Sequence, residues 1–297
     1  DEMGIDRVEL RRRNLIPADS MPYMSPLGLN YDSGEHHSTL DQALALTDAA
    51  GFAERRKETE LKGLLRGIGY STYVESSGGA PRERAEIDII GEEKRVEVVI
   101  GTQSSGQGHE TSFCQVAAEW LGVPFETVQL LQGDTDFVKV GGGSHSGRSM
   151  RMAGTVIVMA GDTLIEKGKG IAAHVLEAAP DDIDFADGIF TISGTDRSIG
   201  IFDLAIEAKS RDDLPEELQG GLNSEAENVM HQLAFPYGAH ICEVEIDPET
   251  GALTLDRYGC VDDVGRVINP IILDGQIHGG IVQGAGEAML EDFIFDP

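Results

Sequence analysis

Three glycine-rich segments, each joined to apolar residues at helical spacing, constrain this sequence more than any other feature. They lie at residues 104–108, 141–149 and 275–286. Glycine lets the backbone turn with a positive φ and lets another group approach closely. A helix that begins beside such a turn presents unpaired N–H groups and a partial positive charge. The sequence therefore predicts three helix starts at which an anion can bind.

Between these segments the sequence predicts short strands. Residues 84–90 and 95–100 alternate between apolar and polar, as do residues 239–246 and 253–261, and each pair is separated by turn residues. A loop and a helical pattern follow each hairpin. We expect an α+β fold with two-layer antiparallel sheets backed by helices, and the repeated order of hairpin, loop and helix hints at an internal duplication.

Apolar residues at helical spacing predict the helices that back these sheets. They fall at residues 1–13, 40–50, 109–121, 150–178 and 271–290. Ser38 or Thr39 is expected to cap the second of them. Residues 181–230 hold 13 acidic and 3 basic side chains, so we expect a solvated, partly flexible face there.

Charge and cysteine content exclude several classes of partner. The chain has 23 Lys and Arg against 52 Asp and Glu, a formal net charge of −29, which argues against nucleic acid and against an anionic membrane surface. Its apolar runs are shorter than the ~20 residues of a membrane-spanning helix. Cys114, Cys242 and Cys260 are far apart and form no CxxC pair, which favours a reducing compartment, the cytoplasm.

The first glycine-rich segment ends in Gly106-Gln107-Gly108-His109, where a predicted helix begins. Its glycines allow a phosphate to approach the backbone, and the Gln107 amide can both donate and accept a hydrogen bond. The alternative is a tight strand-to-helix turn in which Gln107 faces water.

The second segment opens the longest predicted helix. It offers the hydroxyls of Ser144, Ser146 and Ser149 and the cationic fork of Arg148. In so acidic a chain, an arginine beside glycines indicates an anion site, and the alternative is a flexible surface loop with Arg148 pointing outward. Neither of the first two segments has the spacing of a Walker motif or of a dinucleotide fingerprint.

The third segment is itself helical in pattern. Gly275, Gly279 and Gly280 would let this helix pack closely against another backbone or a flat ligand, and Gln276 is expected near its first turn. The alternative is a glycine-rich core helix selected for close packing.

Histidine and cysteine give weaker signals. His36 and His37, with acidic neighbours, can bind a metal, but adjacent loop histidines are more typical of a solvated pair. Cys114 lies mid-helix among apolar residues, which favours a core thiol over a nucleophile. The remaining histidines considered, His174, His231 and His240, have no evident partner in the sequence.

Asp262 and Asp263 can be read as paired carboxylates, but a turn with one capping aspartate is the favoured interpretation. None of these clusters predicts a metal site, so we expect none.

Taken in order, the glycine-rich segments resemble the molybdopterin-binding large subunit of the xanthine dehydrogenase/aldehyde oxidase family. The stretches that carry the resemblance are Met3–Asp6 with Arg13-Asn14-Leu15, Gly101–Gly122, Gly133-Asp134-Thr135, Gly143–Ser149, Val261–Pro270 and Gly275–Gly286. They span nearly the whole chain. Ser144–Ser149 resembles the carbon monoxide dehydrogenase branch more than the animal xanthine oxidases, although the usual Gly-Ser-Arg is Ser146-Gly147-Arg148 here.

The resemblance implies a bound molybdopterin, in its cytosine dinucleotide form, that carries molybdenum. By position, Gln107, Gly108 and His109 would line the pterin or phosphate, and Gln276 would hydrogen-bond the pterin. The residues that would hold the phosphate or nucleotide end are Ser144, Ser146, Gly147, Arg148 and Ser149. The implied reaction is hydroxylation of an aldehyde or N-heterocycle at carbon, or oxidation of carbon monoxide, with water as the oxygen source.

The resemblance also implies a fragment of a longer subunit. Residues 1–62 would be a helical lead-in and loop from an upstream part, residues 63–230 the first lobe of the molybdopterin-binding domain, and residues 231–297 the truncated start of a second lobe. The implied partners are the remainder of the subunit, an FAD subunit and a [2Fe-2S] subunit, in a complex that forms a dimer.

The family's catalytic glutamate lies in a Gly-x-Gly-Glu segment beyond Pro297, so no catalytic residue is expected in this chain, and Glu287 and Glu291 are expected to be structural. The chain alone is expected to bind no cofactor and to be inactive. A second class of function uses the same loops: a non-catalytic module that binds an anion or nucleotide, or that docks partners during assembly.

Overall fold

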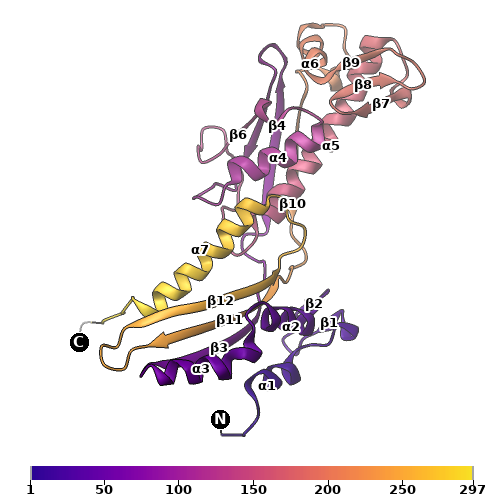
Figure 1. Ribbon diagram of the computed structural model, residues 1–297. Helices are drawn as coiled ribbons and strands as arrows, with labels where there is room; N and C mark the ends of the chain where they lie inside the picture. Colours follow the sequence, from indigo (N-terminus) through magenta and orange to yellow (C-terminus); the bar gives the residue numbers. More distant parts are fainter. Residues whose placement is uncertain (1, 296–297) are drawn as a thin grey trace. The chain divides into compact units, whose positions relative to one another are not determined.

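The computed structural model describes residues 2–295, and the chain forms two compact units, drawn in Figure 1. The first unit contains the described residues up to Ser77, Leu233–Val267 and those from Ile277 onward. The second unit contains Gly78–Gln232 and Ile268–Gln276. This division differs from the boundary expected at residue 62, because a strand at 65–74 pairs within the first unit.

The first unit is built on a three-stranded antiparallel sheet in the order β12-β11-β3. Its strands are β3 (Leu65–Val74), β11 (Tyr237–Ile246) and β12 (Leu253–Asp263). The expected hairpin between β11 and β12 is confirmed. Side chains alternate between the two faces of each strand, so odd-numbered residues of β11 face one side and even-numbered residues the other.

Three helices and a small hairpin complete this unit: α1 (Arg7–Asn14), α2 (His36–Leu46), α3 (Phe52–Leu61), β1 (Tyr23–Met24) and β2 (Asn30–Tyr31). The helix expected from residue 1 begins at Arg7, because the Asp6 carboxylate accepts hydrogen bonds from the N–H groups of Val8 and Glu9. The cap predicted for α2 at Ser38 or Thr39 was wrong, since α2 already begins at His36.

A four-stranded sheet in the order β10-β4-β5-β6 forms the base of the second unit. Its strands are β4 (Arg82–Ile90), β5 (Arg95–Ile100), β6 (Val128–Leu131) and β10 (Asn223–Val229). The predicted hairpin of β4 and β5 is confirmed, but β6 runs parallel to β5 rather than antiparallel. The chain returns from β5 to β6 through α4 (His109–Leu121), which makes this parallel pairing possible.

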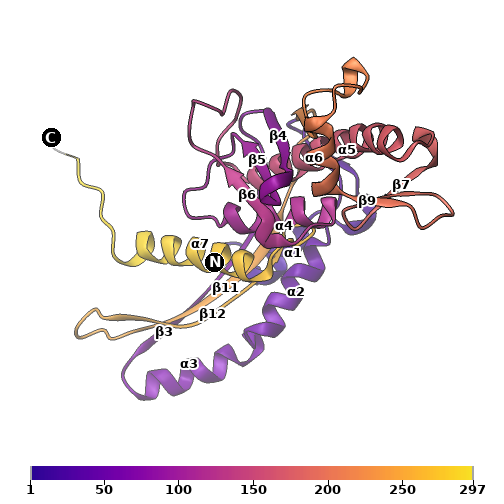
Figure 2. The same ribbon diagram turned by 90° about the horizontal axis from the view of Figure 1, so that it is seen from above.

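The long helix α5 (Ser149–Leu176) packs against β4 and α4, and α6 (Ile201–Ser210) packs against α5. A small sheet of β7 (Ile183–Ala186), β8 (Ile189–Ile192) and β9 (Ser198–Gly200) packs against α5, and β7 and β9 are labelled beside that helix in Figure 2. The acidic side chains of 181–230 are nearly all exposed, as expected of a solvated face, but the segment also forms these strands and α6. Apolar residues between the acids, such as Phe190 and Leu204, are fully buried.

The last helix, α7 (Pro270–Met289), begins in the second unit and continues in the first, as its residues divide at Gln276 and Ile277. Its predicted position is confirmed. Among residues 2–295, none of the helices is both long enough and apolar enough to cross a membrane.

Candidate functional site

Two glycine loops of the second unit lie in direct contact. The first loop (residues 101–108) leads from β5 into α4, and the second loop (residues 141–148) leads into α5. A Cβ atom on Gly101 would lie 2.2 Å from the Cα of Gly141, so neither position has room for a side chain. The Ser144 hydroxyl donates a hydrogen bond to the Gln103 carbonyl, which ties the loops together at a second point.

The start of α7 joins these loops within the same unit. A Cβ on Gly108 would lie 2.9 Å from Cδ1 of Ile272, and Gly108 also has a φ of +75°. Asn269 donates from Nδ2 to the Gln115 side chain of α4 at 2.8 Å and accepts a bond from the Ile272 N–H at 3.0 Å. The first loop therefore contacts both the second loop and the start of α7, whereas a Cβ atom on Gly275, in the third glycine-rich segment, would meet nothing within 4 Å.

The first loop leaves the start of α4 open. Gly108 has no side chain to cap the helix, and the first N–H groups of an α-helix have no intrahelical partner. The Gln107 amide holds the loop in shape: its Oε1 accepts from the Ser105 N–H at 2.6 Å, and its Nε2 donates to the Ser105 hydroxyl at 3.2 Å. Gln107 is half-buried rather than turned fully to water.

His109 is the most informative residue of the site. Its ring stacks on Phe113 with centroids 4.3 Å apart, and the residue is only 4% exposed. Its Nδ1 atom is buried and has no hydrogen-bond partner in the described part of the chain. Burial lowers the pKa of His109, so the ring is neutral at pH 7. A buried polar atom without a partner is uncommon in folded proteins and needs a partner such as water, an ion or a ligand.

Arg148 does not have the environment that either sequence interpretation expected. Its guanidinium is fully buried and donates to the Glu83 carboxylate at 3.0 Å, to the Thr102 hydroxyl at 3.2 Å and to the Ala80 carbonyl at 2.9 Å. It also donates to the Arg82 carbonyl at 3.2 Å. Because its guanidinium donates to these protein groups, Arg148 holds the start of α5 against β4. It neither points outward nor leaves its guanidinium available to an anion.

Glu83, the partner of Arg148, was missed by the sequence analysis. Besides Arg148, it accepts a hydrogen bond from the Gly142 N–H at 3.2 Å and one from the Thr102 hydroxyl. The alternation of β4 holds the missing signal, because Glu83 occupies the same face as Ala85 and Ile87, which are buried. A glutamate on the apolar face of a strand needs a buried cation.

The remaining polar residues of the second loop lie at its turn and at the open start of α5. Ser146 and Gly147 both have positive φ, +51° and +65°, and the Ser146 hydroxyl lies 3.2 Å from Nδ1 of the exposed His145. Ser149 is the first residue of α5, whose start has no side-chain cap in the described structure. The N-terminus of α5 therefore offers a second set of unpaired N–H groups beside that of α4.

Gln276 is not at the helix start where the sequence analysis placed it. Helix α7 begins at Pro270, so Gln276 is its seventh residue, in the second turn, and its side chain is exposed. Its backbone N–H is used inside the helix, and only the side-chain amide can reach a ligand.

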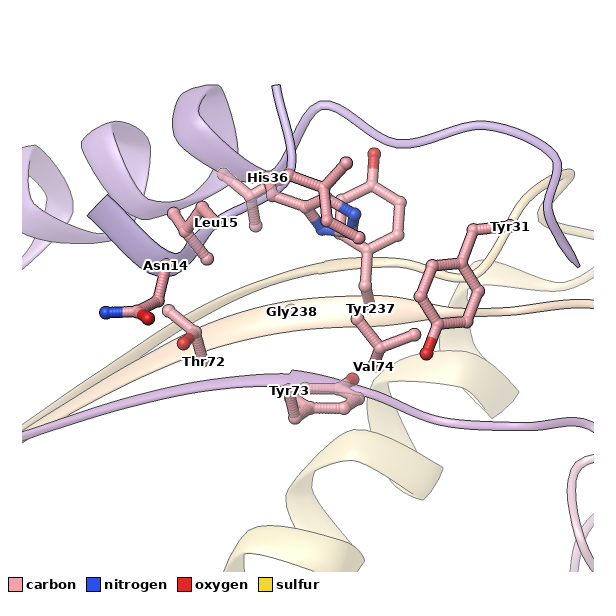
Figure 3. Close-up of a pocket in the computed structure, with 11 residues that line it drawn as sticks. Asn14, Leu15, Tyr31, His36, Thr72, Tyr73, Val74, Tyr237 and Gly238 are labelled. Atoms are coloured by element: carbon pink, nitrogen blue, oxygen red, sulfur yellow. The ribbon is translucent and has the colours of Figure 1, made fainter. Parts of the chain in front are cut away.

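His36 lines a separate cavity of about 210 Å³ in the first unit, shown in Figure 3. Its ring packs edge-on against the Tyr237 ring, with the ring centroids 4.4 Å apart. The buried Nε2 atom of His36 has no partner among the described residues. His37 instead bonds through Nε2 to the Arg12 carbonyl at 3.2 Å. The expectation of a solvated pair was wrong for His36, and the two rings do not share a site.

Other sequence candidates have clear partners. Cys114 is buried with a raised thiol pKa, as expected for a core thiol. His174 lies 3.0 Å from the Asp213 carboxylate, and His240 lies 3.0 Å from Asp262, so both histidines have partners that the sequence did not reveal.

Asp262 and Asp263 lie at the end of β12 and alternate between its faces, so they are not paired carboxylates. Asp263 accepts a bond from the Gly265 N–H at 3.0 Å, which confirms the expected turn cap.

Comparison with known proteins gives a consistent result. The family model described as "Molybdopterin cofactor-binding domain" matches residues 42–297. The chain is 33% identical to the carbon monoxide dehydrogenase large chain of Hydrogenophaga pseudoflava and 32% identical to 6-hydroxypseudooxynicotine dehydrogenase complex subunit gamma of Paenarthrobacter nicotinovorans. Each alignment covers 99% of this chain and 38% of the relative.

Solved structures agree in fold. Quinoline 2-oxidoreductase from Pseudomonas putida 86 superposes with a TM-score of 0.87 and 30% identity, over 99% of this chain and 39% of that one. The chain thus spans somewhat more than a third of the length of the relatives that it matches.

Proposed function

Since the chain belongs to the molybdopterin cofactor-binding domain family, we propose that its second unit supplies part of the cofactor cradle of a molybdenum hydroxylase. The observation that carries the proposal is the buried Nδ1 of His109, which has no partner among the described residues and lies where the first loop contacts the second loop and the start of α7. The donors there, which are backbone N–H groups, hydroxyls and a neutral imidazole, suit a polar, anionic ligand such as a pterin phosphate.

The proposed roles follow from the contacts. Gln107, Gly108 and His109 line the pterin or its phosphate, and the open start of α5 at Ser149 holds the phosphate end, with Ser144, Ser146 and Gly147 shaping that loop. Arg148 acts as a positioning residue, because its guanidinium is committed to Glu83 and backbone carbonyls. Gln276 reaches the pterin through its side-chain amide.

When bound, the molybdenum cofactor supplies the two-electron oxidation of a carbon centre with water as the oxygen source. The residues of this chain hold the anionic groups through N–H donors, and His109 keeps a neutral ring that can donate or accept one hydrogen bond at Nδ1. We propose the cytosine dinucleotide form of the cofactor and FAD and [2Fe-2S] partner subunits. The substrate class is an aldehyde, an N-heterocycle or carbon monoxide, and the sparse free cysteines favour a cytoplasmic complex.

The test replaces His109 with phenylalanine in the protein purified with its partners. His109→Phe keeps the stacking on Phe113 but removes both ring nitrogens, so molybdenum and pterin content should fall at least several-fold. His36→Phe is the matched control, because it removes a buried, unpartnered ring nitrogen from the first unit and should leave the cofactor content unchanged.

Unchanged molybdenum in folded His109→Phe protein would contradict the proposed cradle. Molybdenum and pterin missing from every preparation, with the fold intact, would instead favour the non-catalytic binding or assembly module.

A further inference from the structure

The face of the β3-β11-β12 sheet that is turned away from α2 carries a cluster of metal-binding side chains. Ala239 and Ile241 pack against α2 on one face, so the even-numbered His240 points to the other. The antiparallel register pairs His240 with Cys260 and Gly238 with Asp262. Ligand atoms of His240, Cys260 and Asp262 all lie within 4.8 Å of one another.

Both the histidine and the carboxylate have outer partners of the kind that orient metal ligands. His240 Nε2 lies 3.0 Å from Asp262 Oδ1, and His240 Nδ1 lies 2.8 Å from the Tyr258 hydroxyl. Tyr73 donates to Asp262 Oδ1 at 2.8 Å. A metal-bound histidine characteristically engages its second ring nitrogen in this way, which fixes the tautomer and the ring orientation.

Gly238 makes the cluster possible. A Cβ atom at this position of β11 would lie 2.0 Å from Asp262 Oδ1 and 2.5 Å from the Tyr73 ring. Tyr73 on β3 and Asp262 on β12 therefore meet across the middle strand only because residue 238 has no side chain. The Asp262 side chain, 5% exposed, is thereby brought beside His240 Nε2.

The surroundings favour a cation. His240 Nε2 and the Tyr73 hydroxyl both lie within hydrogen-bond distance of Asp262 Oδ1, so the carboxylate is held beside the imidazole and the thiol. A thiol, an imidazole and a carboxylate together suit Zn²⁺ rather than Mg²⁺ or Ca²⁺, which prefer oxygen ligands alone.

We propose that His240 Nε2, Cys260 Sγ and one Asp262 carboxylate oxygen bind a zinc ion, with water as the fourth ligand. Zinc binding forms bonds to these three atoms, and the thiol proton passes to solvent. The imidazole stays neutral: the Nε2 proton that faces Asp262 is released to solvent, and Nδ1 takes up a proton from solvent, with which it donates to the Tyr258 hydroxyl. No electron is transferred, and the residues of the proposed molybdopterin cradle take no part.

Cobalt provides the most direct test, because a thiolate-bound Co²⁺ ion shows a charge-transfer band that Zn²⁺ abolishes on displacing it. The purified, reduced and metal-depleted protein is titrated with Co²⁺ and then with Zn²⁺. We expect one Co²⁺ per chain with a thiolate band. Cys260→Ser should remove the band and weaken zinc binding by more than the about 10- to 100-fold that the loss of an outer partner causes.

Cys242→Ser is the matched control, since Cys242 is a free thiol on the same face that lies outside the three-residue cluster. It should leave both the band and the zinc affinity unchanged. Tyr258→Phe keeps all three ligands and should weaken zinc binding about 10- to 100-fold, which keeps the proposal testable even if Cys260→Ser fails to fold. A titration without a thiolate band, or a band lost in Cys242→Ser and kept in Cys260→Ser, would overturn the proposal.

Discussion

The two units of the molecule are stabilised by different means. The second unit has a continuous apolar core contributed by its sheet and by α4, α5 and α6, with Phe113, Leu164 and Phe190 fully buried. Among the described residues of the first unit, the apolar core cluster has four buried members, Leu40, Ala43, Ala239 and Ile241. Beyond that core, ion pairs between charged side chains stabilise the sheet instead.

Those charges centre on Glu243 of β11, which is fully buried. Arg55 donates to it from Nε at 3.1 Å, and Arg66 donates at 2.8 Å. Arg66 also donates to Asp256 at 2.6 Å and to Glu245 at 3.1 Å, which links all three strands. The comparison teaches that a large apolar core can support precise glycine loops, whereas a small core depends on ion pairs to hold its strands in register.

The largest effect should come from removing the acid of each unit's buried ion pair. Glu83→Ala leaves the buried Arg148 without its carboxylate partner, a loss of about 3–5 kcal/mol. Glu243→Ala removes the buried carboxylate that Arg55 and Arg66 share, and should cost about as much although Arg66 keeps Asp256 and Glu245. In the first unit that loss should unfold the sheet, whereas in the second it should loosen the glycine loops while the core persists. Urea unfolding followed by hydrogen exchange of peptides from β11 and from α5 distinguishes the two outcomes.

Glu9→Ala serves as the control for this pair of variants, because its bond to Arg13 joins two side chains that are about half exposed. It should cost less than about 1 kcal/mol. If Glu243→Ala were equally mild, the first unit would not depend on its charges and the comparison would fail.

A smaller effect is expected at the junction of the glycine loops. Gly108→Ala places a Cβ at positive φ, which costs roughly 1–2 kcal/mol, and also against Ile272. Gly106→Ala has the same kind of backbone penalty at φ +107° but meets nothing within 4 Å. Gly108→Ala should therefore lower the unfolding temperature and the molybdenum content more than Gly106→Ala does. Equal decreases in the two variants would show that contact with Ile272 does not matter.

The smallest effect is a dependence on pH. Burial lowers the pKa of His36 in the first unit and of His109 in the second below the ordinary histidine value of ~6.5. The unfolded chain then binds more protons, so the stability from each neutral ring is complete above the unfolded pKa and is lost as the pH falls through the folded one. Each unit should be less stable at pH 5 than at pH 7.

Phenylalanine at each position sharpens this test. His109→Phe should flatten the pH dependence of the second unit alone, and His36→Phe that of the first unit alone. If neither variant changes the slope of stability against pH, the pH dependence comes from other titratable groups.

Much of the fold could be predicted because its signals are local. The β4–β5 and β11–β12 hairpins, α4, α5 and α7 follow from alternation, helical spacing and turn residues. The segment 181–230 could not be read in this way, because its acidic residues concealed the apolar positions that the core buries. The parallel pairing of β5 and β6 is set by packing rather than by the composition of either strand.

Part of the candidate site could be predicted from local pattern. The first two glycine-rich segments do lie in contact, whereas the role of Arg148 depends on Glu83, which lies 65 positions earlier in the chain. The cluster around His240 depends on strand register. Regular pairing of β11 with β12 around the turn at 247–251 would place His240 opposite Gly259, and an irregularity between Glu243 and Val244 moves it opposite Cys260.

The central claim is that the two contacting glycine loops, together with the start of α7, hold the molybdenum cofactor. Hydrogen exchange of the intact complex, prepared with cofactor and from molybdenum-starved cells without it, tests this most directly. We predict that the cofactor slows exchange in peptides covering residues 101–110, 141–152 and 269–276. Unchanged exchange in those peptides, with protection confined to other parts of the complex, would contradict the account.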